Sequence, residues 1–198
     1  MSAKSKKNKI VIGITGGFSS GKTTAVSFFA KKGALRIDAD KIAHTILKND
    51  VGVKKKLIKI FGNKILSGDK INRKKLGETA FSDKGEIAQL GSLLHPKITK
   101  TILKNIKESK REVVVVDAPL LIETGLSEHM DLVVLVSAAR ARQLKWAVAR
   151  GFSVEQVKKI VGYQLPLSFK KAFADFVINN DDTIEKIKKG VDRIWQGL

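Results

Sequence analysis

Residues 16–23 read GGFSSGKT, and they follow the apolar run Lys9-Ile-Val-Ile-Gly-Ile14 after the single residue Thr15. These eight residues fit the phosphate-binding loop pattern G-x-x-x-x-G-K-[ST]. In a strand–loop–helix turn of this kind, backbone N–H groups converge on phosphates, Lys22 reaches the outer phosphates, and the Thr23 hydroxyl coordinates Mg²⁺. The stretch therefore predicts a phosphate site at the start of a helix.

The flanking residues have the pattern that such a loop requires. Residues 10–14 are almost continuously apolar, as expected of a parallel strand buried on both faces. Apolar residues then recur at helical spacing, lysines favour the helix C-terminus, and a glycine can end the helix: Ala25, Val26, Phe28, Phe29, Lys31, Lys32 and Gly33. A glycine-rich turn without a ligand is the less favoured alternative.

Four further strands are expected by composition, at residues 34–37, 113–116, 132–136 and 176–178. The intervening segments carry helical periodicity. Strands that alternate with helices predict an α/β fold with a doubly wound, mostly parallel sheet of five strands, whose ligand binds at the carboxyl ends of the strands.

Two long segments do not fit a simple crossover between strands. Residues 47–111 read as almost wholly helical and predict an inserted subdomain that covers a substrate, within which His95-Pro96 is expected to mark a helix start. Residues 139–172 predict a basic helical hairpin that closes as a lid. The nucleotide-binding core would then comprise residues 9–46, 112–138 and 173–198.

Length and composition set the class of protein. A chain of 198 residues with 43% hydrophobic content is long enough for one substantial core. Neither a membrane span nor a hydrophobic secretory signal is recognisable, so we expect a cytoplasmic protein without membrane partners. Zero cysteines exclude disulfides and thiolate metal sites. The lysine-bearing tail, residues 1–8, is predicted to be disordered.

The chain is strongly basic, with 38 Lys plus Arg against 19 Asp plus Glu and a formal net charge of +19. Such a charge attracts nucleotides and, less specifically, nucleic acid or acidic membrane surfaces. The lysine clusters at 54–56 and 186–189 fall in helix-like segments, between the apolar positions. We therefore favour solvated helix faces over a specific nucleic-acid site.

Three carboxylates lie at the expected ligand side of the sheet. Asp38 and Asp40 stand where the second strand ends and a helix begins, so either could accept a proton from an attacking hydroxyl or cap the helix. Asp117 ends a run of four valines, which is typical of a Mg²⁺-associated carboxylate but also of a turn residue. Arg150 is a candidate for neutralising charge on a transferring phosphoryl group, with a surface residue as the alternative.

Several motifs together resemble the dephospho-CoA kinase family: residues 15–24, Asp38-Ala-Asp-Lys-Ile-Ala-His44, Leu94-His-Pro96, Asp117-Ala-Pro-Leu-Leu-Ile-Glu-Thr-Gly125 and residues 143–150. The resemblance implies a P-loop three-layer fold with a helical acceptor-binding insert and a helical lid. It also implies a phosphotransferase that uses ATP and Mg²⁺ to phosphorylate the ribose 3′-hydroxyl of dephospho-CoA, the last step of coenzyme A synthesis.

The resemblance also assigns roles to residues. Asp40 matches the family's proposed general base, Arg150 a lid arginine, and Arg73 a basic position of the acceptor-binding insert. His95, Pro119 and Leu120 fall on motifs near the acceptor. The loop residues expected to hold the phosphates of ATP are Gly16, Gly17, Ser19, Ser20, Gly21, Lys22, Thr23 and Thr24, with Thr23 and water on Mg²⁺ and Lys22 sharing the catalytic role.

Three positions depart from the family pattern. Ser19 replaces the usual glycine, so the backbone there must tolerate a side chain. Trp146 and Lys170 each stand where arginine is common. Lysine keeps the charge without the planar donor fork, and tryptophan supplies neither, although it could stack on an adenine ring.

Two other functions share parts of this pattern. A nucleoside or nucleotide kinase would share the loop, Mg²⁺ and a lid, but the Asp-Ala-Asp and His-Pro motifs argue against it. A nucleotide-dependent switch or RNA-associated ATPase is disfavoured because Asn63-Lys64-Ile65-Leu66 lacks the aspartate of a guanine-reading tetrad. We expect small-molecule partners, ATP and dephospho-CoA, and a monomer or weak homo-oligomer.

Overall fold

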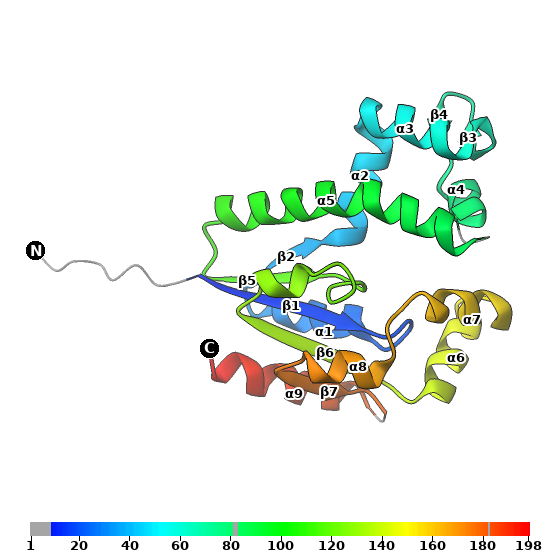
Figure 1. The fold of residues 1–198 in the computed structure, drawn as a ribbon. Coiled ribbons are helices and arrows are strands. Elements are labelled where there is room, and N and C mark those ends of the chain that lie inside the picture. Colours follow the sequence, from blue (N-terminus) through cyan, green and yellow to red (C-terminus); the bar gives the residue numbers. More distant parts are fainter. Residues whose placement is uncertain (1–8, 81–82, 182) are drawn as a thin grey trace, which may run out of the picture. The chain divides into compact units, whose positions relative to one another are not determined.

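The computed structural model describes residues 9–80, 83–181 and 183–198 (Figure 1). The predicted disordered tail, residues 1–8, lies outside the described residues. The chain divides into two compact units. The first comprises the residues up to Asp38 together with Ile106–Leu198, and the second comprises Ala39–Asn105.

The first unit contains a five-stranded sheet among its described residues, with the strand order β2-β5-β1-β6-β7. Every neighbouring pair is parallel. The strands are β1 (Ile10–Gly16), β2 (Leu35–Asp38), β5 (Val113–Asp117), β6 (Leu132–Ser137) and β7 (Phe176–Asn179). All five strands predicted from composition are present, and the predicted α/β fold is confirmed.

Helices of the first unit lie between these strands or follow the last of them. They are α1 (Lys22–Lys31), the short 3₁₀ helix η2 (Leu126–His129), α6 (Arg140–Ala149), α7 (Val154–Gly162), α8 (Leu167–Ala172) and α9 (Ile184–Gln196). The segment predicted as a helical hairpin, residues 139–172, thus contains α6, α7 and the additional short helix α8. Its function as a lid stays a prediction.

The central strands β1, β5 and β6 are buried on both faces, as their apolar runs require. Helices α1 and α9 pack together on one face, where Phe29, Ile187 and Val191 join Ile12 and Ile14 in one core. On the other face, a Cβ atom added at Gly13 would lie 2.6 Å from Leu121 Cδ2. Gly13 therefore allows the segment that follows β5 to pack directly on β1.

The second unit has its own apolar core, formed by Val53, Leu57, Phe61, Ile65, Leu76, Ala80 and Leu94. Its elements are α2 (Ala39–Asn49), α3 (Val51–Phe61), the 3₁₀ helix η1 (Asn63–Ile65), β3 (Leu66–Ser67), β4 (Lys70–Ile71), α4 (Arg73–Ala80) and α5 (Lys84–Glu108), whose last residues belong to the first unit.

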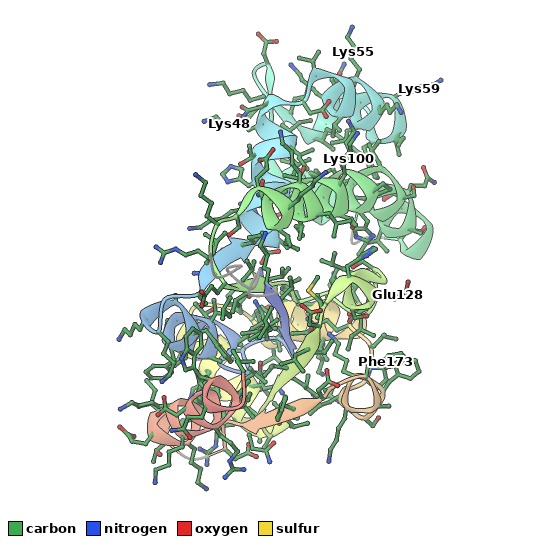
Figure 2. The ribbon with its side chains drawn as sticks, turned by 90° about the vertical axis from the view of Figure 1, so that its left-hand side faces the viewer. Lys48, Lys55, Lys59, Lys100, Glu128 and Phe173 are labelled. Carbon is green, nitrogen blue, oxygen red and sulfur yellow. The ribbon has the colours of Figure 1, made fainter. Side chains whose placement is uncertain are left out.

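Helix α3 shows how the basic sequence is accommodated. Asp50 caps its N-terminus by accepting a hydrogen bond from the Val53 N–H at 2.9 Å. The apolar residues at spacing i, i+4, i+8 are buried, while Lys55 and Lys59 are exposed and point away from the helix (Figure 2). These lysines lie on a solvated helix face, the arrangement favoured from the sequence.

The second unit also contains a small hairpin that the helical pattern did not predict. Strands β3 and β4 pair antiparallel around the two residues Gly68 and Asp69, and Gly68 has a positive φ of 56°. A Gly-Asp pair between strands is a known hairpin signal. Strands of two residues are too short to show alternation, so the turn was the only available signal.

The expected helix start at His95-Pro96 is wrong. Helix α5 runs continuously from Lys84 to Glu108 and contains Pro96 in its interior. Proline removes one N–H and thus leaves the Ser92 carbonyl without its helical donor. Both Ser92 and Pro96 are exposed, so water can solvate that carbonyl, and packing of the helix on either side outweighs the local preference.

Candidate active site

The phosphate-binding loop lies between the carboxyl end of β1 and the N-terminus of α1, as predicted. Gly16 is the last residue of β1, and α1 begins at Lys22, so Lys22, Thr23 and Thr24 form its first turn. Within the loop, the Ser20 N–H donates to the Gly17 carbonyl at 3.1 Å, and the Thr24 N–H donates to the Gly21 carbonyl at 3.0 Å. This geometry directs the positive end of the helix dipole into the loop, where an anion can bind.

The glycines of the loop are required by close contacts. A Cβ atom at Gly16 would overlap the Val136 carbonyl oxygen and the Ser20 hydroxyl. Gly21 has φ 92°, and a Cβ atom there would overlap the side chain of Asn180. Ser19, where the family pattern has glycine, also has a positive φ, of 61°. The backbone thus keeps a glycine-like conformation at Ser19 despite its side chain.

Asn180 supports the loop from the far edge of the sheet. It follows β7, is 8% exposed, and donates from Nδ2 to the Ser20 carbonyl at 2.9 Å. Its own N–H donates to the Ser137 carbonyl at the end of β6. Because the backbone N–H of Asn180 anchors this residue to β6, its buried side-chain amide fixes the direction of the Ser20 carbonyl and hence of the peptide that follows it.

Lys22 belongs to a charged cluster at the ends of β2 and β5. Its ammonium pairs with Asp117 Oδ1, and Asp117 is only 3% exposed. Arg36 Nη2 donates to Asp117 Oδ2 at 2.6 Å and to Asp38 Oδ2 at 2.9 Å. Two cations thus neutralise two carboxylates, and the Asp117 carboxylate defines the position of the Lys22 ammonium.

The donors around the loop fit Mg²⁺ of the kind that arrives with a nucleotide. Thr23 is exposed in the first turn of α1 and can supply one hydroxyl ligand. Both oxygens of Asp117 accept from cations, and the described residues hold no cluster of three or more acidic or histidine side chains suited to a metal. Mg²⁺ typically keeps several waters and takes phosphate oxygens, so one hydroxyl suffices.

The segment after β5, which contains Pro119 and Leu120, is held at the end of β1. The Pro119 carbonyl accepts from Thr15 Oγ1 at 3.0 Å and from Lys170 Nζ at 2.9 Å. Lys170 Nζ also pairs with Glu123 Oε1 at 2.7 Å. Lysine at position 170 therefore keeps the charge of the arginine common there. Its side chain is 1% exposed, and its ammonium binds groups of the protein itself.

Residues between α6 and α8 contact the tip of the loop. Arg150, directly after α6, donates from Nη2 to Ser19 Oγ at 2.6 Å. The Phe18 N–H donates to Gln164 Oε1 at 2.9 Å, and the Phe18 and Phe152 rings meet edge to face with centroids 5.1 Å apart. The structure thus brings the predicted catalytic arginine to the phosphate-binding loop.

Comparison with known proteins agrees with this geometry. The family model described as "Dephospho-CoA kinase" matches residues 10–186. The chain belongs to the dephospho-CoA kinase family. A protein of Coxiella burnetii named dephospho-CoA kinase is 38% identical over 183 residues, which cover 91% of this chain and 92% of that protein.

Two solved structures resemble the fold over nearly its whole length. TT1252 from Thermus thermophilus has a TM-score of 0.82 and 25% identity, covering 96% of this chain and 98% of that one. Dephospho-CoA kinase from Campylobacter jejuni has a TM-score of 0.62 and 28% identity, covering 96% of this chain and 97% of that one.

The described residues contain no helix that is both long and apolar enough to span a membrane.

Three of the predicted catalytic and substrate-binding residues lie in the second unit. Asp40 is exposed in the first turn of α2, and Arg73 is the exposed first residue of α4. His95 lies inside α5, half-buried, and burial lowers its pKa below the ordinary value of 6.5. A Cβ atom at Gly91 would lie 2.9 Å from its ring, so this glycine gives the imidazole room.

Three residues that support the loop or its charged cluster were not predicted from the sequence: Gln164, Asn180 and Arg36. Gln164 and Asn180 gave no signal, because their partners are more than a hundred residues away in the chain. Arg36 did give one. It is a charged residue within an otherwise apolar strand and two residues before a carboxylate, a pattern that indicates a partner at the strand end.

Proposed function

We propose that this protein transfers the γ-phosphoryl group of ATP to the ribose 3′-hydroxyl of dephospho-CoA, giving CoA and ADP. The observation that carries the proposal is the family match over residues 10–186, which includes both the phosphate-binding loop and the second unit. The strand–loop–helix geometry, with Lys22 already held by Asp117, supports phosphoryl transfer in particular.

The phosphates of ATP bind the loop from Gly16 to Thr24. Main-chain N–H groups and the N-terminus of α1 are the fixed donors, so they need little reorganisation during the reaction. Lys22 moves from Asp117 to the outer phosphates, and Arg36 keeps Asp117 paired when it does so. Thr23 would hold Mg²⁺, which when bound offsets phosphate charge.

Asp40 accepts the proton of the 3′-hydroxyl. The O3′–phosphorus bond forms as the bond from the γ-phosphorus to the bridging oxygen breaks, and ADP leaves. Arg150 and Lys22 offset the charge that develops on the transferring group. Arg73, His95, Pro119 and Leu120 contribute to binding of dephospho-CoA, and residues 139–172 close over the nucleotide.

We place this reaction in the cytoplasm, where ATP is made and used, and expect a monomer or weak homo-oligomer.

We do not expect specific binding of nucleic acid, because lysines such as Lys55 and Lys59 lie on a solvated face of α3. Any oligonucleotide binding should weaken steeply with rising salt, as counterion release requires.

The test is an assay of the purified protein with ATP, Mg²⁺ and one acceptor at a time: dephospho-CoA, AMP or RNA. Mass spectrometry should identify 3′-phosphorylated product from dephospho-CoA, with little transfer to AMP or RNA. Preferential transfer to AMP would establish the nucleotide-kinase alternative. ATP hydrolysis stimulated by RNA, without transfer to dephospho-CoA, would overturn the proposal.

A further inference from the structure

The loop tip, residues 18–19, is contacted from outside the loop by three groups. They are the Arg150 guanidinium on the Ser19 hydroxyl, the Gln164 amide oxygen on the Phe18 N–H, and the Phe152 ring on the Phe18 ring. All of these residues belong to the first unit. Only the first of the three contacts joins a side chain of the loop to a cation that can reach phosphate.

Ser19 has an unusual backbone for a residue with a side chain. Among the described residues, it is the one non-glycine residue with a positive φ, 61°. Glycine adopts this conformation without penalty, whereas an L-residue is strained there. Strain of this kind persists where the surrounding structure holds the residue in place, and such residues cluster at ligand-binding and active sites.

The Ser19 side chain has a defined use. Its Oγ accepts from Arg150 Nη2 at 2.6 Å, across 131 residues of sequence. Arg150 follows the last residue of α6 and is exposed, so in the absence of a partner its long side chain would occupy many rotamers. A guanidinium has five N–H donors, so one bond to serine leaves others for phosphate oxygens.

We propose that the Ser19 hydroxyl is a positioning group that holds Arg150 at the phosphate-binding loop before transfer begins. This inference rests on the proposed function, because it assigns Arg150 to the transferring phosphoryl group. The hydroxyl itself takes no part in bond making or breaking. Its contribution is that the arginine loses less conformational freedom when the transition state forms.

Two variants separate the hydroxyl from the strain. Ser19→Ala removes the hydroxyl but keeps a Cβ atom at a positive φ, whereas Ser19→Gly removes the hydroxyl and the strain together. If the hydroxyl positions Arg150, both variants should lower kcat by about tenfold, the range expected for a hydrogen bond to a charged group. Ser19→Gly should nevertheless have a higher Tm than Ser19→Ala.

The kinetic signature distinguishes positioning from a general structural role. Because Arg150 acts on charge that develops during transfer, kcat should fall while KM for ATP stays nearly constant. In an Arg150→Ala background, the serine variants should cause no further loss, since the group that they position is gone. Each variant is assayed by ADP release, whichever acceptor is used.

Several outcomes would overturn the inference. One is a wild-type kcat in both serine variants. A second is a lower kcat in Ser19→Ala alone, which would indicate an effect of backbone strain. A third is a full additional loss of kcat when the serine variants are placed in the Arg150→Ala background. Failure of the proposed function looks different. In that case the wild-type protein itself would not phosphorylate dephospho-CoA, and the Ser19–Arg150 coupling would be read from ADP release with another acceptor or with water.

Discussion

Lys170 and Glu123 form an ion pair with 2.7 Å between Nζ and Oε1, and the lysine side chain is 1% exposed. The same ammonium donates to the Pro119 carbonyl, while Glu123 Oε1 also accepts from the Leu165 N–H at 3.0 Å. This pair joins α8 to the segment after β5 and to the residues just before α8. It therefore fixes the part of the first unit where the acceptor is proposed to bind.

Lys170→Met should lower the free energy of unfolding by about 3 kcal/mol, because it leaves the partly buried Glu123 without its cation. Lys170→Arg keeps the charge and should cost much less. Chemical unfolding followed by circular dichroism measures both variants, with Lys170→Met/Glu123→Leu as a further control that should recover part of the loss. Equal destabilisation by Met and Arg would show that the charge is not what matters.

Lys22→Ala should reduce kcat by about 100-fold or more, since the loop loses its charge on the outer phosphates. The variant also leaves Asp117 with Arg36 as its remaining cation in the cluster, so its fold must be checked by circular dichroism. Lys22→Ala/Asp117→Asn serves as the control, because it removes the carboxylate that has lost one of its two cations and should be equally inactive. Near-normal turnover in either variant would contradict the role of Lys22.

Asp40→Asn should bind ATP and dephospho-CoA with affinities close to those of the wild type, yet transfer phosphate about 100-fold more slowly. The amide keeps the shape of the side chain but cannot accept the proton. Isothermal titration calorimetry measures the binding, and single-turnover kinetics measure the transfer. Asp38→Asn is the matched control, because Asp38 pairs with Arg36 and is not the proposed base. Wild-type turnover in Asp40→Asn would refute the assignment.

His95 should make the protein less stable at mildly acidic pH. Its folded-state pKa lies below 6.5 because of burial, so between the two pKa values the unfolded state binds more protons than the folded state. The contribution is fully present above the unfolded pKa and is lost as pH falls through the folded pKa. Urea midpoints at about pH 5.5 and about pH 7.5 should differ more in the wild type than in His95→Gln.

The exposed His129 provides the control for that measurement. His129→Gln should keep the pH dependence of the wild type. If both substitutions flatten it equally, burial of His95 is not the cause.

Features of the fold with a local signal could be predicted from the sequence. The loop, the strand before it and the helix after it follow from adjacent residues, and the apolar runs locate all five strands. Features that depend on very short strands or on packing between distant segments could not be predicted. Strands β3 and β4 have two residues each, and Pro96 is tolerated because packing extends to both sides of it.

Long-range partners around the loop explain the remaining gap. Ser19 was recognisable as a departure, but its partner Arg150 lies 131 residues further along the chain. Arg36 carried a signal as a charge within a strand, yet only the parallel register of β2 with β5 brings it to Asp117. Spacing patterns contain no information about which strand ends become neighbours.

The bond from Asn180 to the Ser20 carbonyl has a consequence for biosynthesis. The phosphate-binding loop leaves the ribosome before β7 does, because the amide that holds it is encoded 160 residues later. A nascent or C-terminally truncated chain lacking β7 would carry the complete loop sequence without its support. Competence to bind nucleotide should therefore arise only after β7 and Asn180 have been made and have joined the sheet.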